Sequence, residues 1–506
     1  MKSRNDAWSR GRTRLSTRGV MVSGVVVVAT LTAIAVSGPT ADPGRVDPDA
    51  GSLRSTARVL QSETVNTTPL GRDNRSHTRV EPSDVADDPV ARDGSSNPGG
   101  TVHPHVYRLL ADRAGAPVKV WIRLREKDTP AADTARAFGA ADAPADAIAH
   151  LSPRALQRRT LRRTAPGIVD ARDLPVSPAA LAALRAVGVE PVHVSRWLNA
   201  ASAWVDAQAL EQVRRLPFVE SIELVRRSVP LEFANAGGLG TGAGDPNPPV
   251  CPWGIANDQL SQAGIAALHE AGLSGAGVII GVLDTGFATT HEVFNHPDQP
   301  INVIAAWDFV GDDPIVGYEP GDEFQGPGGT VYPHSHGTRV LSTIAGFNPC
   351  AFMGGAYGAS FVLARTEDSS QEVPAEEDAY VAGLEFIEAN GADVATSSLG
   401  YTAWYDWEDM DGLTAVTTVA VNIATENGLV CVTAVGNGGH NGSEPALVAP
   451  SDAFDVIAVG AVNKNGQLAN FSANGPSADG RVKPEVLAMG VAVWSADPIN
   501  DTEYDP

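Results

Sequence analysis

Short apolar runs alternate with helical stretches from residue 253 to the end of the chain. The runs lie at residues 278–284, 303–307, 361–365, 394–399, 429–435 and 456–462, and helices are expected at about 337–346, 375–390 and 411–427. The runs lack polar alternation, which indicates strands buried on both faces. Such strands, alternating with helices, form a parallel sheet. We therefore predict an α/β fold whose functional side chains lie at the carboxyl ends of the strands.

Charge is distributed unevenly along the 506 residues. Residues 251–506 carry 34 acidic and 5 basic side chains, a net charge of −29, whereas residues 1–250 carry 26 acidic and 32 basic side chains, a net charge of +6. The acidic half would repel phosphate groups, which argues against nucleic acid as its partner. The opposite charges are compatible with attraction between the two halves.

The amino terminus has the order of a secretory signal. Six basic side chains lie within residues 1–18, residues 19–41 carry no charge, and small residues follow the apolar centre of this stretch. An uncharged stretch of this length can also span a bilayer, so an uncleaved anchor is the alternative. We predict that residues 1–41 are a signal peptide or a membrane anchor, and that the rest of the chain lies outside the cytoplasm. Contact with a membrane is expected only if this segment stays uncleaved.

One small domain is predicted between two linkers. Residues 42–100 have no apolar periodicity and are typical of a flexible linker. Residues 101–230 combine strand-like runs with helical patterns, including a helix that begins after Ser177, and predict a small α+β domain. Residues 231–250, rich in Gly, Pro and Asn, predict an exposed connector at which proteolytic nicking concentrates.

The three cysteines exclude a disulfide-dense scaffold, and none has the spacing of a zinc or redox motif. Cys431 lies in an apolar run and is expected to be a buried free thiol. Cys251 and Cys350 are able to pair, but no local feature of the sequence decides whether they do.

Three motifs carry polar side chains that suit catalysis. Asp284 ends the first apolar run, where a carboxylate needs a partner but can also cap a turn. His336 opens a predicted helix, where one imidazole nitrogen can face a carboxylate and the other a pocket. His334 lies two residues earlier, but His-x-His alone is a weak metal signal. Asn437 lies in a glycine-flanked turn, from which its amide can donate to an oxyanion, although Asn beside Gly is also common in ordinary turns.

In this order the motifs resemble those of the subtilisin-like serine proteases, the subtilases of peptidase family S8. The matching segments are 281–286 (GVLDTG), 336–338 (HGT), 397–400 (SSLG) and 436–437 (GN), with further resemblance at 356–359, 471–476 and 483–486. Residues 195–223 also resemble the propeptide that precedes such enzymes. The resemblance implies a three-layer subtilisin-like fold with a central, mostly parallel sheet for residues 251–506. The small α+β domain at 101–230 would then be a prodomain that docks on the protease, assists its folding, inhibits it, and is cut off within 231–250.

The resemblance also implies a role for each matching residue. Asp284 would hold and charge-stabilise the imidazole of His336, which would act as general base and then as general acid. Asn437 would donate to the tetrahedral oxyanion. A wall of the groove in which an extended peptide pairs as an added strand would be formed by Ser398, Leu399 and Gly400.

The family's nucleophile is missing from the sequence. Its serine lies in a Gly-Thr-Ser motif, which does not occur in the 506 residues. In subtilisin this serine follows the oxyanion Asn by about 66 residues, which leads from Asn437 to a position near 503 or later. We expect that the sequence is truncated before the serine, and that the polypeptide as written is inactive. Ser472 and Ser495 lack the turn-to-helix context that a replacement would need.

We therefore predict a secreted serine endopeptidase that acts on protein or peptide substrates through an Asp-His-Ser triad. The alternative is a pseudoprotease, a subtilase fold that binds peptides without hydrolysing them. Catalysis is expected to need no cofactor and no metal. Structural Ca²⁺ stays open, because acidic clusters at 376–378 and 406–411 offer oxygen ligands, although neither matches an EF-hand loop.

Overall fold

The structure, a computed structural model, describes residues 99–125, 127, 138–139, 142–226, 251–326, 329–368, 376–402, 405–440 and 445–506. The predicted signal or anchor at 1–41 and the predicted connector at 231–250 lie outside the described residues, as do all but the last two residues of the predicted linker at 42–100. Among the helices that the structure describes, none is long and apolar enough to cross a membrane.

A seven-stranded sheet forms the centre of the carboxyl-terminal part, and every neighbouring pair in it is parallel. In spatial order its strands are β16 (Val486–Met489), β15 (Ile457–Val462), β14 (Val430–Ala434), β13 (Val394–Ser397), β6 (Ile279–Asp284), β12 (Ser360–Arg365) and β7 (Asn302–Asp308). Six of them are the six predicted apolar runs, within two residues at each end, while β16 was not predicted. On one side of β6 the chain moves outward from β13 to β16, and on the other side it passes to the edge strand β7 and then returns to β12. The strand order therefore reverses at β6, and such a reversal is where sheets of this kind form their functional crevice.

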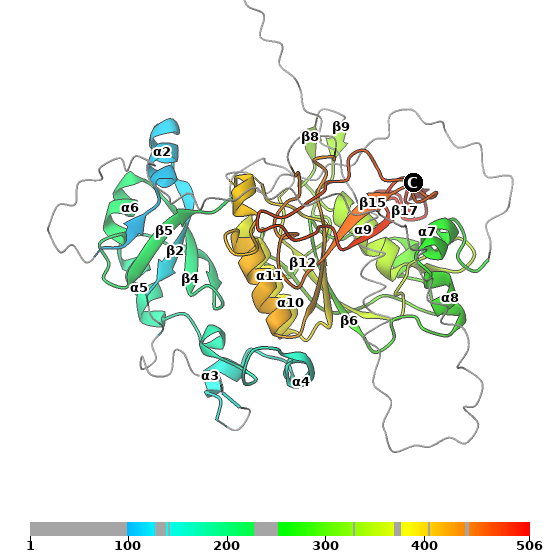
Figure 1. Ribbon diagram of the computed structural model, residues 1–506, viewed down its shortest axis with the longest axis horizontal. Coiled ribbons are helices and arrows are strands. Elements are labelled where there is room, and N and C mark those ends of the chain that lie inside the picture. The colour runs from blue at the N-terminus through cyan, green and yellow to red at the C-terminus, as the bar shows by residue number, and fades with distance from the viewer. Residues whose placement is uncertain are drawn as a thin grey trace, which may run out of the picture. The chain divides into compact units, whose positions relative to one another are not determined.

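Helices cover both faces of this sheet, which confirms the three predicted layers (Figure 1). The helices of the first face are α7 (Asn257–Gln262), α8 (Ile265–Glu270) and α9 (Ser335–Ala345), and those of the second are α10 (Glu377–Ala389) and α11 (Val416–Glu426). Successive side chains of β6 point to opposite faces of the sheet, so Val282 packs in the core of the first face and Leu283 in the core of the second. The predicted helices correspond to α9, α10 and α11, although α11 begins five residues later than expected.

Short elements complete this part of the chain. They are the strand pairs β8 (Phe324–Gly326) with β9 (Gly329–Val331), β10 (Phe347–Asn348) with β11 (Phe352–Met353) and β17 (Ser495–Ala496) with β18 (Tyr504–Asp505), and the single-turn helices η2 (Glu292–Phe294) and η3 (Trp407–Asp409). The first pair precedes α9, so it lies in the chain between β7 and the predicted catalytic histidine.

A second, mixed sheet lies in the amino-terminal part and confirms the predicted α+β character. Its strands, in spatial order, are β1 (Thr101–Val102), β5 (Val219–Leu224), β2 (Val118–Leu124), β4 (Ala200–Val205) and β3 (Pro191–Ser195). Its helices are α2 (Pro104–Asp112), α3 (Ala145–Ile148), α4 (Pro153–Arg162), η1 (Ala171–Asp173), α5 (Pro178–Ala186) and α6 (Ala207–Val213). One hydrophobic core joins this sheet to α2, α5 and α6.

The start of α5 follows the predicted capping pattern. The hydroxyl of Ser177 accepts a hydrogen bond from the backbone N–H of Ala180 at 3.1 Å, and Pro178 occupies the first turn. Helix α4 has the same signals in Ser152 and Pro153, but it was not predicted. Its sequence shows no apolar stripe, because two of its buried residues are Arg158 and Arg159.

The cysteines divide into one pair and one free thiol. Cys251 and Cys350 form a disulfide, which decides the question that the sequence left open. Cys431 is buried and unpaired, as predicted, and burial raises the pKa of its thiol to about 12. It therefore acts as a small apolar side chain in the core.

Candidate active site

Asp284 and His336 meet at the carboxyl edge of the central sheet. Strand β6 ends at Asp284, and α9 places His336 in its first turn. His336 Nδ1 lies 2.5 Å from Asp284 Oδ1, and both side chains are buried. The same carboxylate oxygen accepts the backbone N–H of Thr285 at 2.7 Å. The carboxylate thus fixes the imidazole orientation and favours a proton on Nδ1.

A glycine allows this contact to form. A Cβ added at Gly337 would lie 2.2 Å from the carbonyl oxygen of Gly286 and 3.0 Å from Asp284 Cβ. Helix α9 can therefore approach the end of β6 only where the residue after His336 has no side chain. The glycine of the HGT motif is thus explained by packing.

Asn437 follows β14 in the glycine-flanked turn that the sequence predicted. Its Nδ2 and Oδ1 atoms are buried, and neither has a hydrogen-bond partner among the described residues. The φ of Gly436 is 113°, a conformation that favours glycine, and a Cβ there would meet Val448 at 2.9 Å. An amide that is held in place but unused within the fold retains its capacity to donate to a ligand.

The predicted groove wall continues β13. Strands β6, β13 and β14 are parallel neighbours, so Asp284, Asn437 and the segment after β13 leave the sheet at one edge. The segment itself is buried, and Leu399 packs in the core of the α10 and α11 face. The side chain of Leu399 therefore contributes to packing. Only the backbone of this segment and the hydroxyl of Ser398 remain available to contact a ligand. That hydroxyl has no partner among the described residues. The wall residues are Ser398, Leu399 and Gly400.

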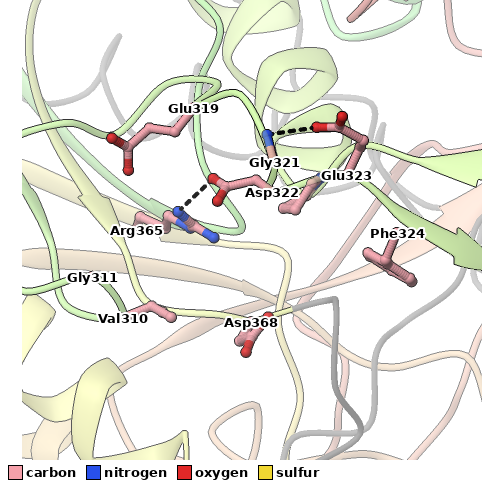
Figure 2. Close-up of a pocket in the computed structure, with 10 residues that line it drawn as sticks. Val310, Gly311, Glu319, Gly321, Asp322, Glu323, Phe324, Arg365 and Asp368 are labelled. Atoms are coloured by element: carbon pink, nitrogen blue, oxygen red, sulfur yellow. Dashed lines mark hydrogen bonds and ion pairs between the residues drawn. The ribbon is translucent and has the colours of Figure 1, made fainter.

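A cavity of about 440 Å³ lies at the same edge, and sequence reasoning did not find it (Figure 2). Arg365 ends β12 directly opposite Asp284 in the strand register, and it lines the cavity together with four carboxylates. Its Nη1 lies 2.8 Å from Asp308 Oδ2 and 3.5 Å from Asp322 Oδ2. The four carboxylates of the lining are Glu319, Asp322, Glu323 and Asp368. The sequence did contain a signal for this cavity, because charged residues such as Asp308 and Arg365 lie at the ends of apolar runs.

Metal-binding groups are not gathered at one point in the described part of the chain, where no cluster of three or more potential ligands occurs. His334 Nε2 lies 3.2 Å from the carbonyl oxygen of Pro498, and burial lowers the pKa of His334. The acidic residues at 376–378 and 406–411 make other contacts. Asp378 receives hydrogen bonds from Lys119 and Ser202, and Asp411 accepts the backbone N–H groups of the turn that follows it.

Comparison with known proteins agrees with this architecture. The model of the subtilase family matches residues 275–505, and that of the peptidase S8 propeptide domain of Bacteroidota matches residues 119–237. The chain is similar to subtilisin E of Bacillus subtilis (strain 168), with 30% identity over 304 residues, 60% of this chain and 65% of that protein. It is also similar to subtilisin DY of Bacillus licheniformis, with 33% identity over 234 residues, 46% of this chain and 72% of that protein. Subtilisin Savinase of Lederbergia lenta is 32% identical over 248 residues, 49% of this chain and 74% of that protein. The chain thus spans slightly less than two thirds of subtilisin E and more than two thirds of the other two, and it belongs to the subtilase family.

Proposed function

We propose that this chain is the precursor of a secreted serine endopeptidase that hydrolyses protein or peptide substrates. The observation that carries the proposal is the hydrogen bond between Asp284 and His336 at the carboxyl edge of the sheet. A buried carboxylate that orients an imidazole is the arrangement by which enzymes activate a hydroxyl nucleophile. Family membership supports the same reaction.

Each site residue would perform one part of acyl transfer. Asp284 holds the ring of His336 and stabilises the imidazolium, while His336 accepts the proton of the attacking hydroxyl and returns it to the leaving amine. Asn437 donates an amide hydrogen to the oxyanion of the tetrahedral intermediate. The backbone of residues 398–400 pairs with the extended substrate.

The nucleophile requires separate treatment. No Gly-Thr-Ser motif occurs in the 506 residues. Ser472 accepts a hydrogen bond from the backbone N–H of Ala461, and Ser495 lies in β17, so neither begins a helix. The proposal therefore requires a serine from outside residues 1–506, and these residues alone are expected to be inactive.

Covalent labelling tests the proposal. The protein is produced from its whole reading frame and treated with a serine-directed phosphonate, with Asp284→Asn and His336→Ala as variants. We expect labelling of the unaltered protein and little labelling of the His336 variant. Peptide hydrolysis by the Asp284 variant should fall by about 10⁴-fold. Peptide binding without labelling or hydrolysis would contradict the proposal and support the pseudoprotease alternative.

We also propose that the amino-terminal α+β domain is a prodomain that docks on the protease, assists its folding and inhibits it. Ser195 donates to Glu385 Oε1 of α10 at 2.5 Å, and the backbone N–H groups of Arg196 and Trp197 also reach this carboxylate. Lys119 lies 2.8 Å from Asp378. The family model for S8 propeptides supports this assignment, while the boundaries 101–230 and 231–250 remain predictions.

Secretion and calcium binding belong to the same proposal. A disulfide supports an oxidising compartment such as the cell exterior. An uncleaved anchor at 1–41 remains the alternative, and protease accessibility of intact cells would separate the two. A melting temperature that falls on addition of a chelator would support structural Ca²⁺, and an unchanged one would contradict it.

A further inference from the structure

Helix α4 lies against the opposite edge of the central sheet from Asp284. It contacts the segments that follow α10 and α11 and precede β13 and β14, at the amino ends of these strands. Strand β6 has six residues and so separates the two edges by about 20 Å. The contact is therefore remote from the candidate active site. It lies about one helical turn along α10 from the contacts of β3 with Glu385, since Glu385 and Glu388 are three residues apart.

Two arginines of α4 bury their charge on the end of α10. Both side chains have no exposed surface. Arg159 donates through Nε and Nη2 to the two oxygens of Glu388, at 2.9 and 2.8 Å. Arg158 donates to the same carboxylate and to the carbonyl oxygens of Ala392 and Asn427. Burial alone would raise the pKa of Glu388, but the two guanidinium groups outweigh burial and hold it below its ordinary value.

A second carboxylate continues this surface. Asp393, immediately before β13, accepts from Arg162 at 2.5 Å and from Arg154 at 2.7 Å. The main chains are joined as well, because Ser152 N donates to Ala389 O at 2.8 Å and Thr164 N donates to Glu426 O at 2.9 Å. Helix α4 is thus fixed at both of its ends.

The shape of the surface matches the helix. Gly391 follows α10 and Gly428 follows α11, both with positive φ. A Cβ at Gly391 would lie 2.7 Å from Arg154 Cβ, and one at Gly428 would lie 2.7 Å from Arg162 Cβ. The carboxyl ends of two helices also carry partial negative charge, which attracts a basic helix.

The segment around α4 has its own small core. Phe138, Ala147, Leu151, Ala155, Val169 and Leu174 form a cluster separate from the core of the five-stranded sheet. Ala389 of α10 packs against this cluster. The segment is therefore attached more extensively to the carboxyl-terminal part than an exposed loop would be.

We propose that Glu388, Asp393, Gly391 and Gly428 form a second docking site on the subtilase domain, which binds the arginine-rich helix α4 and retains the prodomain independently of the substrate groove. Cutting the connector at 231–250 would then release the prodomain only slowly, because α4 remains bound at the far edge of the sheet. This inference rests on the prodomain proposal but not on peptidase activity, since binding is measured directly.

The test uses the full chain with a cleavage sequence for an added protease inserted in 231–250. After cleavage, chromatography in about 1 M NaCl measures how fast the amino-terminal fragment separates from the rest. Arg158→Met with Arg159→Met should accelerate separation by about tenfold or more, since the partners of a buried charge pair mainly set the dissociation rate. Arg185→Met is the control, because Arg185 pairs with Glu190 on the exposed surface of the same fragment. Separation of the double variant at the rate of the unaltered protein would overturn the proposal.

Hydrogen exchange distinguishes a docking role from general destabilisation. In the intact chain carrying Arg154→Ala and Arg162→Ala, amides of residues 153–162 should exchange faster while those of β2 and β4 stay protected. Because these two side chains are partly exposed, this variant is also the reserve if the buried double variant does not fold. Unchanged protection of residues 153–162, or loss of protection throughout the prodomain, would contradict the proposal.

Discussion

Gly337 illustrates how one residue controls the candidate active site, because its missing side chain lets α9 reach the end of β6. Gly337→Ala should lower the free energy of unfolding by about 1–3 kcal/mol, since the new Cβ must displace backbone. It should also weaken the contact of His336 with Asp284. Urea unfolding of the chain measures the first effect. Gly139→Ala, where no atom lies within 4 Å of the added Cβ, is the control and should change little. Equal stability of the two variants would refute the packing argument.

Arg365 gives a second prediction at this scale, because it neutralises the buried Asp308 beside the cavity. Arg365→Met should cost about 3–5 kcal/mol at neutral pH, since it leaves a buried carboxylate without its cation. Burial raises the pKa of Asp308, so its protonated form is favoured in the folded state. Stability is then lost as pH rises through the raised pKa, and the variant should recover part of its loss in acid. A loss that is the same at about pH 4 and about pH 7 would exclude this explanation.

Among the elements, the buried strands were the most predictable from sequence. Apolar runs such as 278–284 gave six of the seven strands of the central sheet, because strands covered on both faces have no polar alternation. Strand β16 was missed because Val486 and Leu487 are exposed and a short run of four residues carries little signal. Helix α4 was missed for a different reason, because its buried face is charged and is neutralised by carboxylates distant in the sequence, Glu388 among them.

The candidate site also has one part that the sequence predicts and one part that only the fold reveals. Asp284, His336 and Asn437 could be predicted as site residues because each lies in a short motif at a strand end or helix start. The cavity was not found, since it joins residues from β12 with residues from the segment between β7 and β8. Pairing of Cys251 with Cys350 also needed the fold, because 99 residues separate the two.

Glu385 of α10 predicts a pH effect on the contact between this helix and the strand end at Ser195. Burial raises the pKa of Glu385 to about 7, against hydrogen bonds from Ser195, Trp197 and Arg196. Because the pKa of Glu385 is raised in the docked state, docking is favoured while this carboxyl is protonated, which is below its ordinary pKa. This contribution to docking is lost as pH rises toward 7. Release of the prodomain after cleavage of the connector should therefore accelerate from about pH 5 to about pH 8.

Glu385→Gln isolates this group from the buried His193, whose pKa burial lowers and whose effect has the opposite sign. The ratio of release rates at the two pH values should be smaller in the variant than in the unaltered protein. A ratio that is equal in both proteins would show that Glu385 does not set the pH dependence.

At the scale of the whole molecule, charge separates the two parts of the chain. Residues 101–230 carry a net charge of +6 and residues 251–506 a net charge of −29. Long-range attraction should speed association of the separated parts, and salt should slow it. Dissociation should respond much less, because pairs such as Arg159 with Glu388 are buried and poorly screened. Stopped-flow mixing and dilution measure the two rates, and an association rate that does not change with salt would argue against attraction between the parts.

The disulfide between Cys251 and Cys350 has a mechanical consequence. Cys251 is the first described residue after the connector, and Cys350 lies five residues beyond Ala345, the last residue of α9. Any cut within 231–250 creates a new chain end within 20 residues of this covalent bond. A pulling force on that end would pass through the bond to the segment after α9, and α7 and α8 would carry none of it. A cargo or surface attached to this chain end would therefore exert force on the protein without unfolding α7 and α8.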